Sequence, residues 1–186
     1  MSSEQAFALV PFGVTEPETG LRLGGRIGRE GERLWVSYGL AGPLQRLAIP
    51  PLSATPRRRD ELWQATCMEL FLALPDQEGY REFNLSPSGD WNVYQLDGYR
   101  RGLRPDPAWT VLPLRRRDPN PEAGADAALE IHLSTTLPPE LAAAPELEAA
   151  VTTVLQLQDG SCRYWALRHL GAEPDFHRRD GFALRL

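Results

Sequence analysis

The chain has 186 residues, of which 42% are hydrophobic and 24% are charged, and its formal net charge is −5. This length is typical of one domain, so we expect residues 1–186 to form a single folded unit. The apolar content argues against disorder, and no apolar run approaches the roughly 18 residues of a membrane-spanning helix. The acidic balance argues against a nucleic-acid partner, because such proteins present a basic face to the phosphates.

The N-terminal segment and the cysteines indicate the cellular compartment. The segment MSSEQAFALVPFGV has no basic residue ahead of its short apolar piece, so it lacks the layout of an export signal. We therefore expect a cytoplasmic protein. In that compartment Cys67 and Cys162 are expected to stay reduced, and no C-x-x-C spacing indicates zinc or redox chemistry.

Short alternating runs, separated by glycine and proline, fill the first part of the chain. Residues 7–10, 21–27 and 34–40 have the composition of strands, and residues 44–49 form a further short apolar run before Pro50. Residues 52–60 are polar and arginine-rich, which predicts a connecting loop long enough to bind a ligand. The arginine clusters at 57–59, 115–117 and 178–179 are interpreted as solvated loops rather than anion sites.

The register of two strands in the centre of the chain can be predicted. Residues 67–74 and 80–86 both alternate, and a loop at 75–79 joins them. Pairing Leu74 with Gly79 separates the apolar side chains from the polar ones, whereas a slip by one residue would bury carboxylates among leucines. The apolar face then contains Met68, Leu70, Leu72, Phe83 and Leu85, and the other face contains Cys67, Glu69, Phe71, Ala73, Tyr80, Glu82, Asn84 and Ser86.

A turn at residues 86–90 leads into another alternating run at 91–97, with Tyr94 and Leu96 on one side and Trp91 and Val93 on the other. Further strands are predicted at 109–114, 128–134, 147–157 and 161–169, with a loop at 118–124 and one helical turn within 137–147. Many short strands with little helix predict an all-β fold, a two-sheet antiparallel β-sandwich of jelly-roll type.

Several motifs carry a resemblance to a known family. They lie at residues 62–71 (LWQATCMELF), 80–94 (YREFNLSPSGDWNVY), 99–100 (YR), 164–169 (YWALRH) and 174–177 (PDFH). In these motifs the chain resembles a family of bacterial DOMON-like domain proteins, which are similar in turn to family nine carbohydrate-binding modules and to the cytochrome domain of cellobiose dehydrogenase. The resemblance spans most of the chain. It implies a sandwich that binds a small ligand, commonly a sugar or haem, on one sheet face or at a sheet end.

Aromatic and polar side chains of these motifs are the candidate ligand contacts. Tryptophan faces can stack on sugar rings, and carboxylates and amides can bind hydroxyl groups or an amine. The competing interpretation is structural, with tryptophans packed in the core and the acidic side chains paired with Arg81, Arg100 or Arg101. Trp35, Trp109 and Trp165 are expected in the core. The candidate site residues are Trp63, Glu69, Tyr80, Glu82, Asn84, Trp91, Tyr99, Arg100, His169 and His177.

We therefore expect a non-catalytic domain that binds a small polar ligand, such as a saccharide or a related metabolite, without a metal or cofactor. The oligomeric state is left open. One rival is an enzyme that uses Glu69 and Glu82 on a glycoside, or a metal held by His169 and His177 with Asp175 or Cys162. Others are a haem protein with iron between Met68 and His169, which the predicted core position of Met68 disfavours, and a structural or interaction module.

Overall fold

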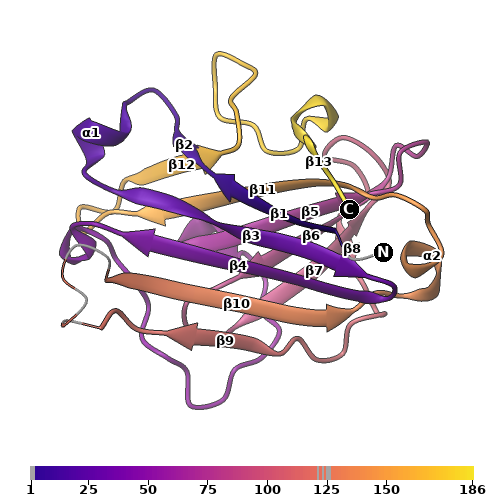
Figure 1. Ribbon diagram of the computed structural model, residues 1–186, viewed down its shortest axis with the longest axis horizontal. Helices are drawn as coiled ribbons and strands as arrows, with labels where there is room; N and C mark the ends of the chain where they lie inside the picture. Colours follow the sequence, from indigo (N-terminus) through magenta and orange to yellow (C-terminus); the bar gives the residue numbers. More distant parts are fainter. Residues whose placement is uncertain (1–2, 121, 123, 125–126) are drawn as a thin grey trace.

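Two antiparallel sheets face each other in the computed structural model, which describes residues 3–120, 122, 124 and 127–186 (Figure 1). The first sheet has the order β1 (Ser3–Ala8), β3 (Arg22–Glu30), β4 (Arg33–Ala41), β10 (Ala128–Thr136) and β9 (Leu114–Arg117). The second has the order β2 (Val10–Pro11), β12 (Cys162–Ala166), β11 (Glu148–Gln156), β5 (Cys67–Ala73), β6 (Tyr80–Leu85), β7 (Trp91–Leu96) and β8 (Arg104–Pro105), and β13 (Leu184–Arg185) pairs with β11. The predicted two-sheet β-sandwich is confirmed.

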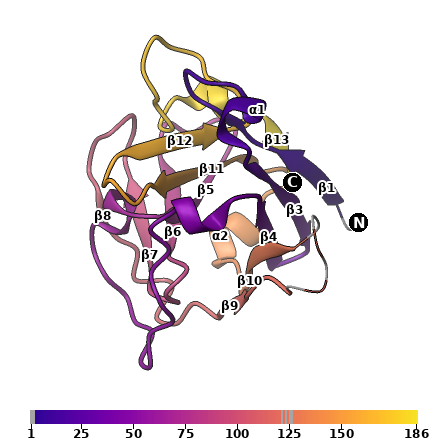
Figure 2. The same ribbon diagram turned by 90° about the vertical axis from the view of Figure 1, so that its left-hand side faces the viewer.

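Helical segments in the described part of the chain are single turns, and the two α-helical turns lie at opposite ends of the sandwich in Figure 1, which Figure 2 shows from one end. They are α1 (Glu16–Thr19), α2 (Pro139–Ala142), η1 (Leu44–Arg46), η2 (Leu62–Gln64) and η4 (Arg179–Gly181). The helical turn predicted within residues 137–147 is therefore present as α2. None of the described helices has the length and apolar character needed to cross a bilayer.

The hydrophobic core fills the space between the two sheets, because each strand turns alternate side chains inward. The predicted pairing of the central strands is confirmed, since Met68 lies opposite Leu85 and Ala73 opposite Tyr80. Met68, Leu70, Leu72, Phe83 and Leu85 have no exposed surface and belong to this core. One hydrogen bond spans it, from the Tyr38 hydroxyl of the first sheet to the main-chain oxygen of Glu69 at 2.6 Å.

Some predicted strands have different bounds. The run at 7–10 is divided at Leu9, where the chain passes from β1 of one sheet to β2 of the other. The strand predicted at 109–114 is wrong, because Pro113 interrupts the run and β9 begins only at Leu114. The run at 44–49 begins as the turn η1, and the strand predicted at 161–169 ends at Ala166.

The interpretations of Trp35 and of the arginine clusters are also corrected. Trp109 and Trp165 lie in the core, but Trp35 is only half-buried on the outer face of the first sheet, where its indole N–H donates to Glu4 at 3.3 Å. Residues 118–120 of the predicted loop have no regular structure, and residues 121 and 123 lie outside the described residues. Each arginine cluster contains side chains that bind main-chain oxygens, namely Arg58, Arg116, and both Arg178 and Arg179.

Arg58 fastens the loop at 52–60 to the second sheet. Its guanidinium donates to Asn92 Oδ1 at 2.7 Å, to the main-chain oxygens of Val93 at 3.1 Å and Asp106 at 3.0 Å, and to that of Trp109. It also lies over the Trp91 ring, 4.6 Å from the centroid. Because this loop leads directly into η2, Arg58 holds the segment that carries Trp63 against the sheet.

We predict that Arg58→Ala lowers the free energy of unfolding by about 3 kcal/mol, because several part-buried carbonyl groups lose their donor at once. Arg57→Ala is the matched control: its side chain is exposed, and the described contact of Arg57 uses its main-chain N–H. Chemical denaturation of the two variants measures the difference. Equal stability of the two variants would contradict this role for Arg58.

Candidate ligand-binding site

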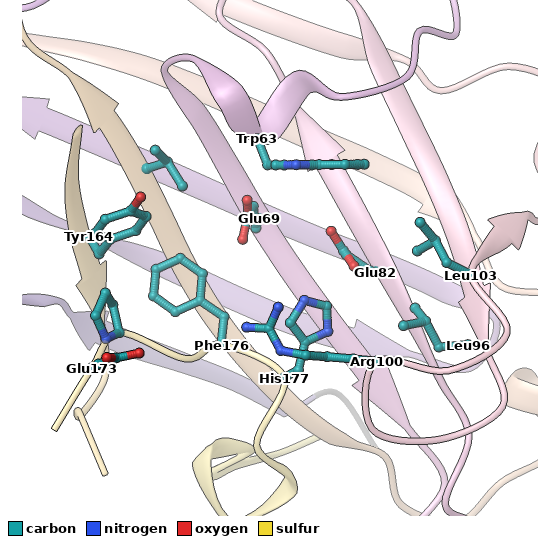
Figure 3. A pocket seen from close by; sticks show the side chains of 12 residues that line it. Trp63, Glu69, Glu82, Leu96, Arg100, Leu103, Tyr164, Glu173, Phe176 and His177 are labelled. Carbon is teal, nitrogen blue, oxygen red and sulfur yellow. The ribbon is translucent and has the colours of Figure 1, made fainter. Parts of the chain in front are cut away.

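A pocket of about 560 Å³ lies on the outer face of the second sheet, on the side away from the core (Figure 3). Strands β5, β6, β7, β11 and β12 form its floor and sides, while η2, the turn after β7 and the segment at 173–177 form its rim. The lining side chains are those of Trp63, Glu69, Glu82, Leu96, Arg100, Leu103, Val154, Tyr164, Glu173, Pro174, Phe176 and His177.

Two carboxyl groups lie at the floor of the pocket. Glu69 of β5 pairs with Asn84 of β6, so Glu82, two residues along β6, is its diagonal neighbour on the same face. Thr152 donates its hydroxyl to Glu69 Oε2 at 3.1 Å, and Asn84 donates its amide to Glu82 Oε1 at 2.9 Å. The second oxygen of Glu82, Oε2, is buried without a hydrogen-bond partner among the described residues.

Burial governs the electrostatics of this pair. The residues are only 3% and 4% exposed, and desolvation raises the pKa of both carboxyl groups above 4.5. The negative charge of Glu82 further raises the pKa of Glu69, whereas Asn84 and Arg100 lower that of Glu82. No ion pair with either carboxyl group is found within the described ranges. The two groups therefore resist being ionised together.

Aromatic side chains form the walls. Trp63 comes from η2 and meets the Tyr94 ring edge-on at 5.6 Å between centroids. Tyr164 of β12 and Phe176 of the C-terminal segment meet edge-on at 6.0 Å. Figure 3 shows the Glu69 and Glu82 side chains between Trp63 on one side and His177 and Arg100 on the other. The pocket thus combines flat apolar walls with a polar floor.

The C-terminal segment is fastened over one end of this sheet face. Nδ1 of His177 shares a hydrogen bond with the Tyr80 hydroxyl at 2.8 Å, and Asp175 accepts from Tyr99 at 2.5 Å and from Arg100 at 3.0 Å. Burial, and then the charge of Arg100, lowers the pKa of His177 to about 4, partly offset by Asp175. His177 is therefore a neutral, hydrogen-bonded side chain near neutral pH. The face is covered where Phe182 packs on Phe71 and Tyr80, and it is open at the pocket.

Two residues with a strained backbone conformation lie at the pocket. Within the described residues, Glu61 with φ 61° and Arg100 with φ 52° are the non-glycine residues with positive φ. Glu61 immediately precedes η2, which carries Trp63, and Arg100 itself lines the pocket. Strained conformations of this kind persist where the surrounding structure enforces them, and they are concentrated at functional sites.

The structure brings half of the sequence-predicted site residues into the pocket lining: Trp63, Glu69, Glu82, Arg100 and His177. Three others do not line the pocket but bind residues of its lining or of the adjacent C-terminal segment. Tyr80 binds His177, Asn84 binds Glu82, and Tyr99 binds Asp175.

Two of the predicted residues lie elsewhere. Trp91 pairs with Leu85 and therefore points into the core between the sheets, where it is 5% exposed. Nε2 of His169 contacts the main-chain oxygen of Val10 at 2.9 Å, and its ring packs on Phe12. Neither side chain lines the pocket.

Sequence reasoning missed several lining residues, chiefly Tyr164, Glu173 and Phe176. Tyr164 had a signal, because it precedes Trp165 in an alternating run and must face the opposite way once Trp165 is placed in the core. Phe176 and Glu173 belong to an irregular segment, where no periodicity indicates which way a side chain points.

The metal and haem hypotheses find no geometric support. No cluster of three or more His, Cys, Asp or Glu residues suited to a metal occurs in the described part of the chain. His169 and His177 have separate partners, Val10 and Tyr80. Met68 has no exposed surface within the core, whereas His169 packs on Phe12 outside it, so the two cannot ligate one haem iron.

Comparisons with known proteins place the fold. No protein-family model and no curated sequence matches the chain. A Bacteroides uniformis protein, provisionally assigned as carbohydrate-binding, is similar in structure with a TM-score of 0.51 and 12% identity, over 93% of this chain and 83% of that one. A family 9 carbohydrate-binding module from Caldicellulosiruptor kristjanssonii gives TM-scores of 0.46 with cellotriose bound and 0.43 with glucose bound, each at 10% identity, over 87% and 84% of this chain and 71% and 70% of the module. At such identities the likeness of the first protein shows a shared sandwich fold.

The buried carboxyl pair predicts a pH-dependent stability. A folded-state pKa raised above 4.5 means that the stability contributed by the protonated group is present below that pH and is lost as the pH rises through the folded pKa. Glu69→Gln cannot ionise at this position. We therefore predict that its melting temperature, measured relative to that of the wild type, increases as the pH is raised from about 4.5 to 8.5. His177, whose lowered pKa acts in the opposite direction, is present in both proteins and cancels in the difference.

Thermal denaturation across this pH range measures the gap between the two proteins. Glu130→Gln is the control, since Glu130 is an exposed side chain that pairs with Arg117 at 3.7 Å on the other sheet. Parallel pH profiles for the wild type and Glu69→Gln would show that the carboxyl group titrates as it does in solvent.

Proposed function

We propose that the pocket binds a small saccharide or a related polar metabolite and performs no chemistry on it. The observation that carries the proposal is one buried oxygen of Glu82, a side chain that lines the pocket, because this oxygen has no hydrogen-bond partner in the part of the chain that the structure describes. Leaving a buried acceptor without a donor is unfavourable by roughly 1–3 kcal/mol. A ligand hydroxyl group that reaches this oxygen would supply the missing donor.

The walls and the size of the pocket support the same proposal. A sugar ring presents an apolar C–H face that packs on flat aromatic surfaces, and Trp63, Tyr164 and Phe176 offer such surfaces around the carboxyl groups. The volume of about 560 Å³ falls within the range of about 300–1,000 Å³ that is usual for small-molecule sites.

The fold shared with the B. uniformis protein, itself provisionally assigned as carbohydrate-binding, is consistent with this proposal. We further propose, from the sequence motifs, that the chain is a single cytoplasmic domain of the DOMON-like type.

A titration of saccharides followed by tryptophan fluorescence and by melting temperature tests the proposal. The panel includes glucose, galactose, xylose, N-acetylglucosamine and cellotriose. We predict a saturable response to at least one of them, and that Trp63→Ala weakens it about tenfold or more, because the stacking surface is lost.

Trp35→Ala is the matched control, since Trp35 lies on the outer face of the other sheet and should leave the affinity unchanged. A flat response across the whole panel would overturn the proposal, as would equal affinity in Trp63→Ala. If the protein released reducing sugar from a glycoside and Glu69→Gln abolished this release, the pocket would be a catalytic site and the proposal of binding without chemistry would be wrong.

A further inference from the structure

The pocket is lined by more acidic than basic side chains. Glu69 and Glu82 lie at its floor, and Glu173 is at the rim. The lining cation, Arg100, is already paired, because its Nη2 lies 3.0 Å from Asp175 and Asp175 also accepts the Tyr99 hydroxyl. The charge of Arg100 is therefore balanced by Asp175, and neither Glu69 nor Glu82 forms an ion pair within the described residues.

His177 does not supply that cation. Its Nδ1 atom is engaged by the Tyr80 hydroxyl at 2.8 Å, and its pKa of about 4 keeps the ring neutral in the range where most ligands are bound. The groups that touch the two carboxyls in the described structure, the Thr152 hydroxyl and the Asn84 amide, are uncharged. The two floor carboxyl groups thus have no ion-pair partner among the described residues, and the nearby charge of Arg100, which lowers the pKa of Glu82, is already shared with Asp175.

An ammonium group matches this arrangement better than a hydroxyl group. Both can donate to the unpartnered Glu82 oxygen, but an ammonium group has three donors and a positive charge that compensates a buried carboxylate. Aromatic faces also attract cations when water is excluded, and Trp63, Tyr164 and Phe176 surround the same space.

Resting on the proposed saccharide binding, we propose that the ligand is an amino sugar with a free amine, and that its ammonium group binds at the floor against Glu82 Oε2 beside Glu69. The sugar ring then lies between the aromatic walls.

A matched trio of sugars tests this step: glucosamine, glucose and N-acetylglucosamine, titrated by calorimetry at slightly acidic pH, where the free amine is protonated. We predict that glucosamine binds about tenfold tighter, or more, than either uncharged sugar, as is usual for hydrogen bonds to a charged group. Glu82→Gln keeps the shape of the side chain but removes its charge, and it should abolish the preference for glucosamine over glucose.

Glu130→Gln removes one negative charge on the other sheet and should keep the preference, which separates the pocket from a general attraction of cations to an acidic protein. If Glu82→Gln does not fold, Glu69→Gln serves as the second variant, with the same expected loss of preference.

The outcomes distinguish the two proposals. Equal affinity for glucose and glucosamine would overturn the amine inference and leave saccharide binding intact. Saturable binding of ethanolamine with no response to any sugar would overturn saccharide binding, and with it the amino sugar. A preference for glucosamine that survives in both Glu82→Gln and Glu69→Gln would overturn the placement of the amine at this floor.

Discussion

The pairing of β5 with β6 is the constraint on which the rest of the molecule depends. Side chains alternate across a sheet, so the alignment of Met68 with Leu85 sends every leucine of the two strands into the core and both carboxyl groups outward. A slip by one residue would reverse this and bury the carboxyl groups among leucines, at a high free-energy cost. The core therefore fixes the site: the packing that stabilises one face positions Glu69 and Glu82 on the other.

The face of β5 and β6 that carries Glu69 and Glu82 is unusual, because its polar side chains are buried and not all of their hydrogen-bonding capacity is used. The C-terminal segment covers part of it through Phe182 and His177, and the loop held by Arg58 covers another part. Between them remain two carboxyl groups with raised pKa values, and one of their oxygens has no hydrogen-bond partner among the described residues. Buried acceptors without donors lower the free energy of unfolding of a protein, and a ligand that supplies donors raises it again.

The sequence was most informative where a regular period met a strong contrast between polar and apolar residues. It predicted the register of β5 and β6, and thereby the outward position of Glu69 and Glu82. It did not indicate that Phe176 reaches the pocket, since docking of an irregular segment depends on contacts with residues nearly 100 positions earlier in the chain, such as Tyr80 with His177. Trp91 was included in the predicted site because it belongs to one of the family motifs. Its side chain is on the same face of the strand as that of Val93, and this position already indicated the core.

The central claim is that the Glu69 and Glu82 carboxyl groups form the floor of a ligand site. Carbon-13 NMR of the glutamate side-chain carboxyl groups, assigned with Glu69→Gln and Glu82→Gln, observes both directly. We predict that the two resonances titrate above pH 4.5 in the free protein and shift saturably as a saccharide is added. Two carboxyl groups that titrate near pH 4.5 and do not respond to the sugar that binds would contradict it.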